Sequence, residues 1–189
     1  GELLELSLEP RSSVAELKLR VAQRWRIPPA CQRLLLGTQV LADSEEVGAH
    51  CPDGAAALPA PLSLVVSLDA LSVDLEDESA DRRLGAVHSL AKLGMKAGEG
   101  AISAVRSRLE DEEYHVRKAA VEALAQVAET GSGQAVAVAL EFLEDEDEDV
   151  RSAALQTLAR VACRGDERAL EALFARLQDE HWQVRRAAL

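Results

Sequence analysis

The feature that most constrains this sequence is a pattern that recurs every 34 residues in its second half. Its clearest copy begins at Leu143 with a run of acids, continues through a Val-Arg pair, and ends with alanines and leucines at helical spacing. One period away in either direction the pattern starts again at Leu109 and Leu177, and a fourth copy starts at Leu75. A fixed period of this length predicts a solenoid, in which each repeat stacks on the next.

Each repeat contains two helical patterns, each with one apolar stripe. The first helices are expected over residues 82–95, 115–129 and 149–163, with a stump from 183, and the second helices over residues 99–110, 133–143 and 166–178. Glycines separate the paired helices. The apolar positions Leu68, Leu71 and Leu75 predict a shortened helix that caps the solenoid. The sequence therefore predicts an all-α solenoid over residues 69–189, with its last repeat truncated.

One copy of the pattern reads Asp149-Val150-Arg151, followed by Ala154 and Leu158 at helical spacing. This pattern resembles HEAT repeats, in particular the short type named after phycobilisome lyases, and the resemblance covers about residues 75–189. It implies an armadillo-type α-solenoid that binds other proteins. The tetratricopeptide repeat has the same length, but its Trp, Gly, Tyr and Pro pattern is absent.

An arginine and an aspartate recur in register through the repeats: Arg83, Arg117, Arg151 and Arg185, with Asp111, Asp145 and Asp179. The HEAT resemblance implies that each arginine pairs with an acid of the adjoining turn, and an anion site is the alternative. The acidic run 144–149 is expected to cap the next helix and to complement its positive N-terminus. A metal site or a site for a basic partner is the alternative there.

Residues 1–68 show no repeat. Leucines alternate with polar residues over 4–8, which predicts a strand. Ser13 and Glu16 have capping-box spacing and precede a helix whose buried face should contain Val14, Leu17 and Val21. Further strands are expected at Leu34–Leu36, with a turn at Gly37, and at Leu62–Val66.

Residues 27–29 read Ile-Pro-Pro, and residues 32–36 read Gln-Arg-Leu-Leu-Leu. Together with the preceding helix they resemble ubiquitin and ubiquitin-like domains, over about residues 3–68. The resemblance implies a β-grasp fold, a sheet wrapped around one helix. The family's first strand has no counterpart here, and no Gly-Gly tail follows Ser67, as in built-in domains that are not conjugated to substrates. The missing strand and the truncated last repeat predict a fragment of a longer protein. We expect a ubiquitin-like domain at 1–68 and HEAT-like repeats at 69–189.

The ubiquitin resemblance also implies a binding surface. Domains of this family present an apolar patch on the sheet face to helical receptors. The matching positions are Leu35 and Val65, with Ser63 where ubiquitin has a histidine. Residues 1–68 are therefore expected to dock to ubiquitin-pathway machinery such as the proteasome, a segregase or a ligase.

The net charge and the cysteine content limit the classes of binding partner and the cellular compartments that fit this sequence. A net charge of -12 argues against nucleic acid or an anionic membrane as the main partner. No signal peptide is visible, and no apolar run is long enough to span a membrane. Three cysteines without paired spacing indicate free thiols in a reducing compartment. We expect a cytoplasmic protein, with the nucleus as the alternative.

Residues that could perform chemistry are scattered. His88, His115 and His181 are isolated and none precedes a glutamate, and Cys163 has no catalytic constellation near it in sequence. We therefore expect no catalytic, cofactor or metal site, and a non-catalytic protein-binding scaffold. The alternative, suggested by the repeat subtype alone, is a bilin-lyase-like subunit that acts on phycobiliproteins. Co-expression with a phycobiliprotein and bilin would give a coloured adduct only in that case.

Overall fold

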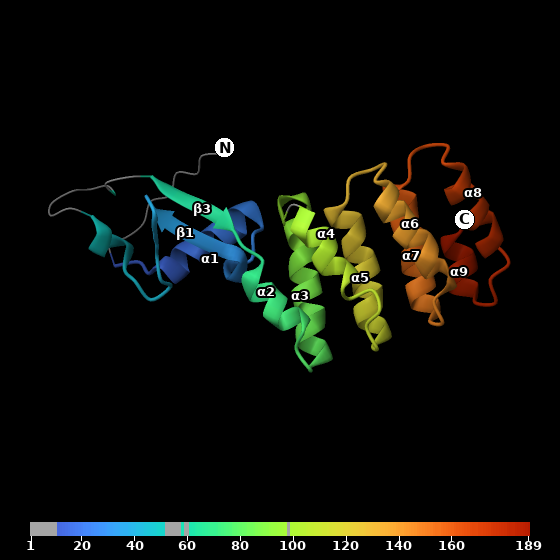
Figure 1. The fold of residues 1–189 in the computed structure, drawn as a ribbon, viewed down its shortest axis with the longest axis horizontal. Coiled ribbons are helices and arrows are strands. Elements are labelled where there is room, and N and C mark those ends of the chain that lie inside the picture. Colours follow the sequence, from blue (N-terminus) through green and yellow to red (C-terminus); the bar gives the residue numbers. More distant parts are fainter. Residues whose placement is uncertain (1–10, 52–57, 59–60, 98) are drawn as a thin grey trace. The chain divides into compact units, whose positions relative to one another are not determined.

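The computed structural model describes residues 11–51, 58, 61–97 and 99–189 (Figure 1). The chain divides into two compact units, residues 1–67 and residues 68–189. The first unit combines one long helix with a small sheet, and the second consists of helices. The expected order, an α+β part followed by an all-α repeat, is confirmed.

The helix of the first unit, α1 (Val14–Trp25), begins at a capping box. Ser13 Oγ accepts the backbone N–H of Glu16 at 3.2 Å, and the Glu16 carboxylate accepts the backbone N–H of Ser13 at 3.1 Å. These reciprocal bonds satisfy two donors that a helix N-terminus otherwise leaves free. The helix ends at Arg26, whose φ of 56° is left-handed. The capping box expected from the sequence is therefore confirmed.

The sheet of the first unit has three described strands, β1 (Gln32–Leu36), β2 (Gln39–Val40) and β3 (Leu62–Val66), in the order β2-β1-β3. Both pairings are antiparallel, and Leu35 stands opposite Val40 on one side and Ser63 on the other. Two 3-10 turns, η1 (Pro29–Cys31) and η2 (Val47–His50), complete this unit. The strands at 34–36 and 62–66 are confirmed. The strand expected at 4–8 lies outside the described residues.

One side of the sheet packs on α1. The buried residues of this core are Val14, Leu17, Val21, Leu34, Leu41 and Val47. The 1 % exposed Gln32 also lies inside, where its Nε2 donates to the carbonyl oxygens of Lys18 at 2.9 Å and Ile27 at 2.8 Å. Its neighbour Cys31 is fully covered, and burial raises the pKa of this thiol to about 11.

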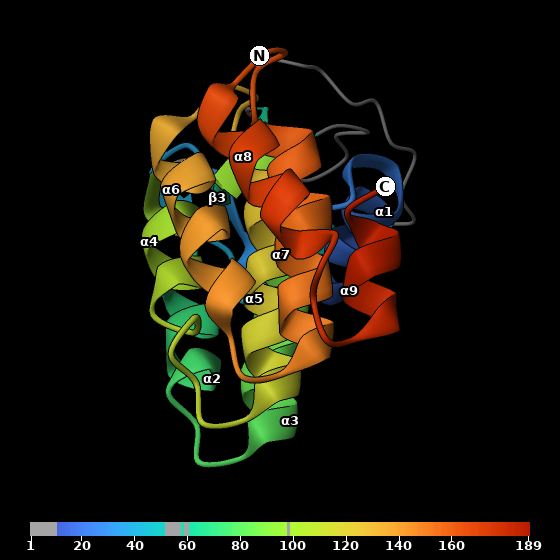
Figure 2. The same cartoon turned by 90° about the vertical axis from the view of Figure 1, so that its right-hand side faces the viewer.

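The second unit is a stack of helix pairs. Its helices are α2 (Asp69–Leu75), α3 (Ala80–Leu93), α4 (Glu99–Arg106), α5 (Tyr114–Val127), α6 (Gly133–Glu141), α7 (Glu148–Val161), α8 (Glu167–Arg176) and α9 (Trp182–Ala187), with 3-10 turns η3 (Gly94–Ala97) and η4 (Phe142–Glu144). Helices α3, α5, α7 and α9 lie side by side in chain order, and α4, α6 and α8 form a second layer (Figures 1 and 2). No helix of the described residues is both long and apolar enough to cross a membrane.

The core of this unit repeats with the sequence. Leu90, Leu124 and Leu158 stand one period apart and are all fully buried. Alanines also recur: Ala120 and Ala154 stand one period apart and have no exposed surface. Small side chains let neighbouring helices pack closely. Because the same leucines and alanines recur every 34 residues, the interfaces between successive repeats are built from the same residue types. The expected solenoid is confirmed.

One turn of the solenoid requires glycine. Gly131 has a φ of +87°, and its N–H donates to the carbonyl of Val161 in the following repeat at 2.7 Å. A Cβ at this position would lie 2.9 Å from Cys163 Sγ. The left-handed backbone strains any other residue here, and an added Cβ would require the Cys163 side chain to shift.

Candidate protein-binding surfaces

A row of arginine–aspartate pairs lies where the first helix of each repeat begins. The arginines are the fourth residues of their helices: Arg83 in α3, Arg117 in α5, Arg151 in α7 and Arg185 in α9. The aspartates Asp111, Asp145 and Asp179 lie in the turns that precede α5, α7 and α9. We call this row the arginine ladder.

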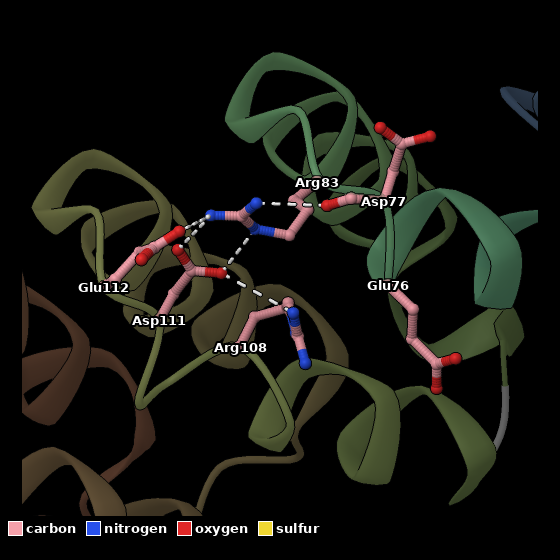
Figure 3. Close-up of a pocket in the computed structure, with 6 residues that line it drawn as sticks. All are labelled: Glu76, Asp77, Arg83, Arg108, Asp111 and Glu112. Carbon is pink, nitrogen blue, oxygen red and sulfur yellow. Dashed lines mark hydrogen bonds and ion pairs between the residues drawn. The ribbon is translucent and has the colours of Figure 1, made fainter.

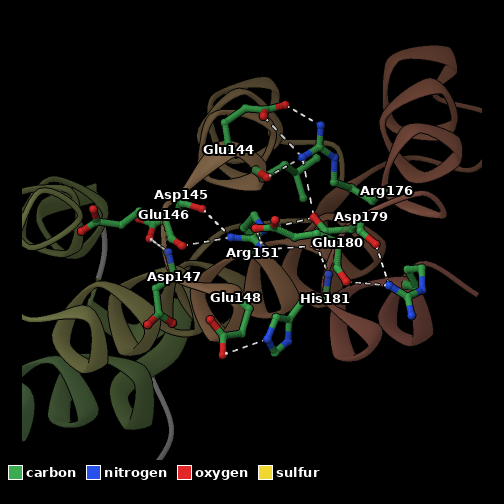
Figure 4. Close-up of polar contacts among 12 residues, drawn as sticks. Glu144, Asp145, Glu146, Asp147, Glu148, Arg151, Arg176, Asp179, Glu180 and His181 are labelled. Carbon is green, nitrogen blue, oxygen red and sulfur yellow. Dashed lines mark hydrogen bonds and ion pairs between the residues drawn. The ribbon is translucent and has the colours of Figure 1, made fainter.

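Each inner arginine of the ladder joins two repeats. Arg117 Nη1 donates to the carbonyl oxygens of Asp111 and Glu112, at 2.9 and 3.2 Å, in the turn before its own helix. Its Nε and Nη2 donate to the two carboxylate oxygens of Asp145, at 3.0 and 3.1 Å, in the turn of the next repeat. The same forked bond recurs in Arg83 with Asp111 (2.7 and 2.8 Å, Figure 3) and in Arg151 with Asp179 (3.1 and 3.1 Å, Figure 4).

The aspartates also accept hydrogen bonds from backbone N–H groups of their own turns. Asp145 accepts the backbone N–H of Asp147 at 2.9 Å. Asp147 in turn caps α7, because its side chain accepts the N–H groups of Asp149 and Val150 at 2.9 and 3.3 Å. In the acidic run 144–149, Glu144, Asp145 and Glu146 therefore pair with arginines and Asp147 caps a helix, as expected for a structural turn.

The inner pairs are buried. The side chains of Arg83 and Asp111 are 7 % and 2 % exposed. Burial acts to raise the pKa of Asp111, but the hydrogen bonds from Arg83 and from the backbone N–H of Glu113 outweigh it, so this pKa lies below its usual range. The hydrogen bond to Asp111 raises the pKa of Arg83. These guanidinium groups are occupied by carbonyl and carboxylate acceptors, which favours a structural ladder over an anion site.

The fourth arginine differs. Arg185 Nη1 donates to the carbonyl oxygens of Asp179 and Glu180, at 2.7 and 2.8 Å, as in the other repeats. Its side chain is exposed, and within the described part of the chain no aspartate accepts from its Nε and Nη2.

A second row, made of exposed glutamates, follows the ladder. These residues, which we call the acidic row, are Glu112, Glu146 and Glu180, with side chains 80 %, 87 % and 87 % exposed. Each lies within 3.3 to 3.8 Å of the Nη2 of the preceding ladder arginine. Two hollows lie along this edge. One of about 260 Å³ includes Arg83, Arg108 and Asp111 (Figure 3), and one of about 370 Å³ is lined by Tyr114 and by acids of two turns.

The first unit presents its own surface on the side of the sheet that faces away from α1. In an antiparallel pair, directly opposed residues share a face, as do residues two apart on one strand. Leu35 therefore shares this face with Ser63 and Val40, and Arg33 with Val65. Val65 and Val40 are 47 % and 55 % exposed, Ser63 is exposed, and Leu35 is half-buried. We call these five residues the outer face.

The structure thus brings Leu35, Ser63 and Val65 onto one surface and adds Val40, which the sequence analysis missed. Its strand β2 has two residues, too few to show an alternating pattern. The turn at Gly37, which has a φ of +62°, was the available signal. A hairpin turn there returns the chain beside β1 and places a valine next to Leu35.

Metal-binding side chains do not gather into a site in the described ranges. No group of three or more His, Cys, Asp or Glu side chains there could hold a metal ion. His181 lies 3.5 Å from Glu148 of the preceding repeat and forms part of a repeat interface (Figure 4). The three cysteines are free, and the exposed Cys163 lies after the end of α7.

Comparisons with known families agree with both units. The family model described as HEAT repeats matches residues 68–132 and 126–189, and the ubiquitin family model matches residues 1–51. A curated relative, Ubiquitin-like protein 1 of Schizosaccharomyces pombe, is 31 % identical over 64 residues, which are 34 % of this chain and 82 % of that protein.

Solved structures resemble the helical part. A designed armadillo repeat protein in complex with the peptide (KR)4 is 26 % identical, with a TM-score of 0.53. A second designed armadillo repeat protein is 25 % identical, with a TM-score of 0.51. Each match covers 65 % of this chain, and the chain spans 61 % of each of these structures.

Proposed function

Because this chain belongs to the HEAT-repeat family and its first unit to the ubiquitin family, we propose that it is a non-catalytic adaptor. In this proposal the ubiquitin-like unit docks to a helical receptor of the ubiquitin pathway, and the HEAT repeats bind a client protein. Both families are built around surfaces that bind proteins, so a protein-binding role follows from the families themselves. The receptor and the client are the parts that we propose.

The observation that carries the docking role is the composition of the outer face. Val40 and Val65 are about half exposed and flank the half-buried Leu35. Exposed apolar side chains that gather on one surface of a protein mark an interaction site. An amphipathic helix with an apolar stripe would cover this face, and an acidic residue at its edge would meet Arg33.

The test of docking is an NMR titration of the whole chain with a ubiquitin-binding helical peptide. We expect shifts centred on Leu35, Val40 and Val65, with a micromolar to millimolar Kd, about -8 to -4 kcal/mol. Leu35→Asp should abolish them. Leu19→Asp is the matched control, because Leu19 is a 56 % exposed leucine on α1, away from the outer face. A whole chain whose outer face shows no shifts would refute the docking role.

The client of the HEAT unit is proposed to present a basic segment. Residues 69–189 contain 15 Lys and Arg but 25 Asp and Glu. The acidic row places three of these carboxylates in solvent at one-repeat intervals. The resemblance to a designed armadillo protein that was solved with the peptide (KR)4 supports the same chemistry.

The peptide (KR)4 is also the probe for the client site. We expect the chain to bind it with an affinity that falls as salt rises, since exposed charges are screened. The triple variant Glu112→Gln, Glu146→Gln, Glu180→Gln should weaken binding. The control is Glu122→Gln, Glu129→Gln, Glu171→Gln, which removes the same charge from exposed glutamates outside the row. Equal losses in the two triple variants would show that net charge alone attracts the peptide.

A further inference from the structure

One of the two hollows beside the ladder has an aromatic wall. The hollow of about 370 Å³ lies between the turns that precede α5 and α7, and it is lined by Tyr114, the first residue of α5. Tyr114 is 45 % exposed, and its ring makes a T-shaped contact with the ring of His115, with the centroids 5.6 Å apart. We call this space the Tyr114 hollow. It differs from the hollow around Arg83, whose lining residues are all charged.

Carboxylates surround the Tyr114 ring. Arg117 also lines the hollow, but its Nε and Nη2 donate to the two carboxylate oxygens of Asp145, so its charge is already compensated. A ligand that complements these carboxylates is a cation. The acids of the lining come from two consecutive turns and are Glu112, Glu113, Glu146, Asp147 and Glu148.

Two of these carboxylates already contact guanidinium groups of the chain. Glu112 Oε1 lies 3.4 Å from Nη2 of Arg83, and Glu146 Oε1 lies 3.3 Å from Nη2 of Arg117. An ionised carboxylate has two oxygens with about four acceptor sites, and each of these contacts uses Oε1. Because both glutamate side chains are at least 80 % exposed, they can accept from a second donor that arrives from solvent.

The same position of a later repeat shows which group such a ring attracts. Two periods downstream, Trp182 takes the place of Tyr114, and Arg186 takes the place of Lys118. The Arg186 guanidinium lies 5.2 Å from the centre of the Trp182 ring, which is within the range of a cation–π contact. The chain therefore contains an internal example of a guanidinium group beside an aromatic ring at this position of the repeat.

In the repeat that contains α5, the equivalent cation has a different partner. Lys118 Nζ makes a 3.5 Å ion pair with Asp149 of the following repeat. Tyr114 remains about half exposed beside the five carboxylates. A cation of another molecule can therefore approach the ring and the acids together.

We propose that the Tyr114 hollow binds one arginine side chain of the basic client segment. The guanidinium group stacks on the Tyr114 ring and donates N–H hydrogens to Glu112 and Glu146. Arginine fits better than lysine, because a planar guanidinium can stack on a ring and bond to carboxylates at the same time. This inference rests on the proposed basic client, and it specifies where one residue of that client binds and of which type it is.

The test uses the only tyrosine of the sequence as its probe. Replacing Tyr114 with 3-fluorotyrosine gives the whole chain a single 19F NMR signal, which reports on the hollow. The ligands are the peptide (KR)4 and octalysine, which has the same length and charge but no guanidinium group. We expect (KR)4 to shift the Tyr114 signal and to bind more tightly than octalysine at equal salt.

Three variants separate the ring from the surrounding charge. Tyr114→Ala should weaken the binding of (KR)4 about two- to fivefold, the effect of one cation–π contact at an exposed site. Tyr114→Phe keeps the ring and should keep the affinity. Trp182→Ala is the matched control and should leave the affinity unchanged, because it removes an exposed ring that Arg186 already contacts. Circular dichroism of each variant confirms that the helices are retained.

The possible failures point to different conclusions. If (KR)4 binds but neither shifts the Tyr114 signal nor binds more weakly to Tyr114→Ala, the arginine site is refuted and the basic client stands. If (KR)4 does not bind the chain at all, both are refuted. Equal affinities and equal shifts with octalysine would refute the choice of arginine. Equal losses in Tyr114→Ala and Trp182→Ala would show that the hollow is not the site.

Discussion

The two units each bury a cation, and they do so in opposite ways. In the ubiquitin-like unit, the buried Lys18 makes a 2.6 Å ion pair with Asp43, whose side chain is 62 % exposed. In the HEAT unit, Arg117 and Asp145 are both at least nine-tenths buried and are joined by two bonds, and the arrangement recurs in Arg83 with Asp111 and in Arg151 with Asp179. The first pair keeps one charge in water. The second pair withdraws both charges from water and compensates them with each other and with backbone groups of the two turns.

This difference follows from how each unit closes its core. The ubiquitin-like unit brings distant segments together once, so its polar contacts are unique to their positions. The HEAT unit repeats one interface, so the same arginine–aspartate pair recurs between consecutive repeats. The predictions below test this contrast by removing one element at a time.

The largest effect should come from breaking the ladder. Arg151→Ala leaves Asp179 buried without its partner, which costs about 3–5 kcal/mol. Arg164→Ala is the control: this arginine lies in an exposed turn, and its loss should change stability by less than about 0.5 kcal/mol. Denaturant unfolding measures both. Coincident unfolding curves would show that the ladder does not stabilise the solenoid.

The next largest effect should come from a core leucine. Leu158 is fully buried, and Leu158→Ala should cost about 2–5 kcal/mol. Because a repeat contacts only its neighbours, hydrogen exchange should accelerate across α5 to α9 and remain unchanged in residues 11–51. Equal loss of protection in both units would show that the ubiquitin-like unit and the HEAT unit do not unfold independently.

The corresponding change in the ubiquitin-like unit is smaller. Gln32→Ala removes the two hydrogen bonds to Lys18 and Ile27 and should cost about 1–3 kcal/mol. The loss of protection should be confined to the first unit. Gln39→Ala, at an exposed glutamine on β2, is the matched control and should leave exchange rates unchanged.

The smallest effect concerns pH. The pKa values of Asp111 and Asp179 are lower in the folded chain than the unfolded value of about 3.9, so the folded state binds fewer protons in this range. Their contribution to stability is present above about pH 5 and is lost as the pH falls through the folded-state pKa values. The free energy of unfolding of the HEAT unit should therefore drop in acid, and less steeply in Asp111→Asn than in Asp81→Asn, a change on the solvent side of α3.

The repeat made the solenoid easier to predict from sequence than the sheet. Four copies of one pattern fixed the helices to within a few residues and placed Arg117 and Asp145 in register. The sequence did not show which aspartate each arginine binds. The partner lies 28 residues ahead, in the next repeat, because the fork spans the interface between helices that stack.

In the ubiquitin-like unit, local signals such as the Ser13 capping box were sufficient to predict the helix from the sequence. Contacts between segments that lie far apart in the sequence were not predictable. The position of Val40 beside Leu35 depends on a two-residue strand, and the role of Gln32 depends on how α1 and the following turn meet. Neither arrangement leaves a periodic trace in the sequence, because each occurs once in the fold.

Each inner ladder arginine binds an aspartate of the following repeat, and this has a consequence for how genes that encode such repeats change in length. Because donor and acceptor belong to consecutive repeats, duplicating or deleting a block of 34 residues leaves every internal arginine facing an aspartate, wherever in the repeat the block begins. A recombination event of that size needs no compensating substitution. Arrays of this kind can therefore grow or shrink by unequal crossing-over while their interfaces keep the same chemistry.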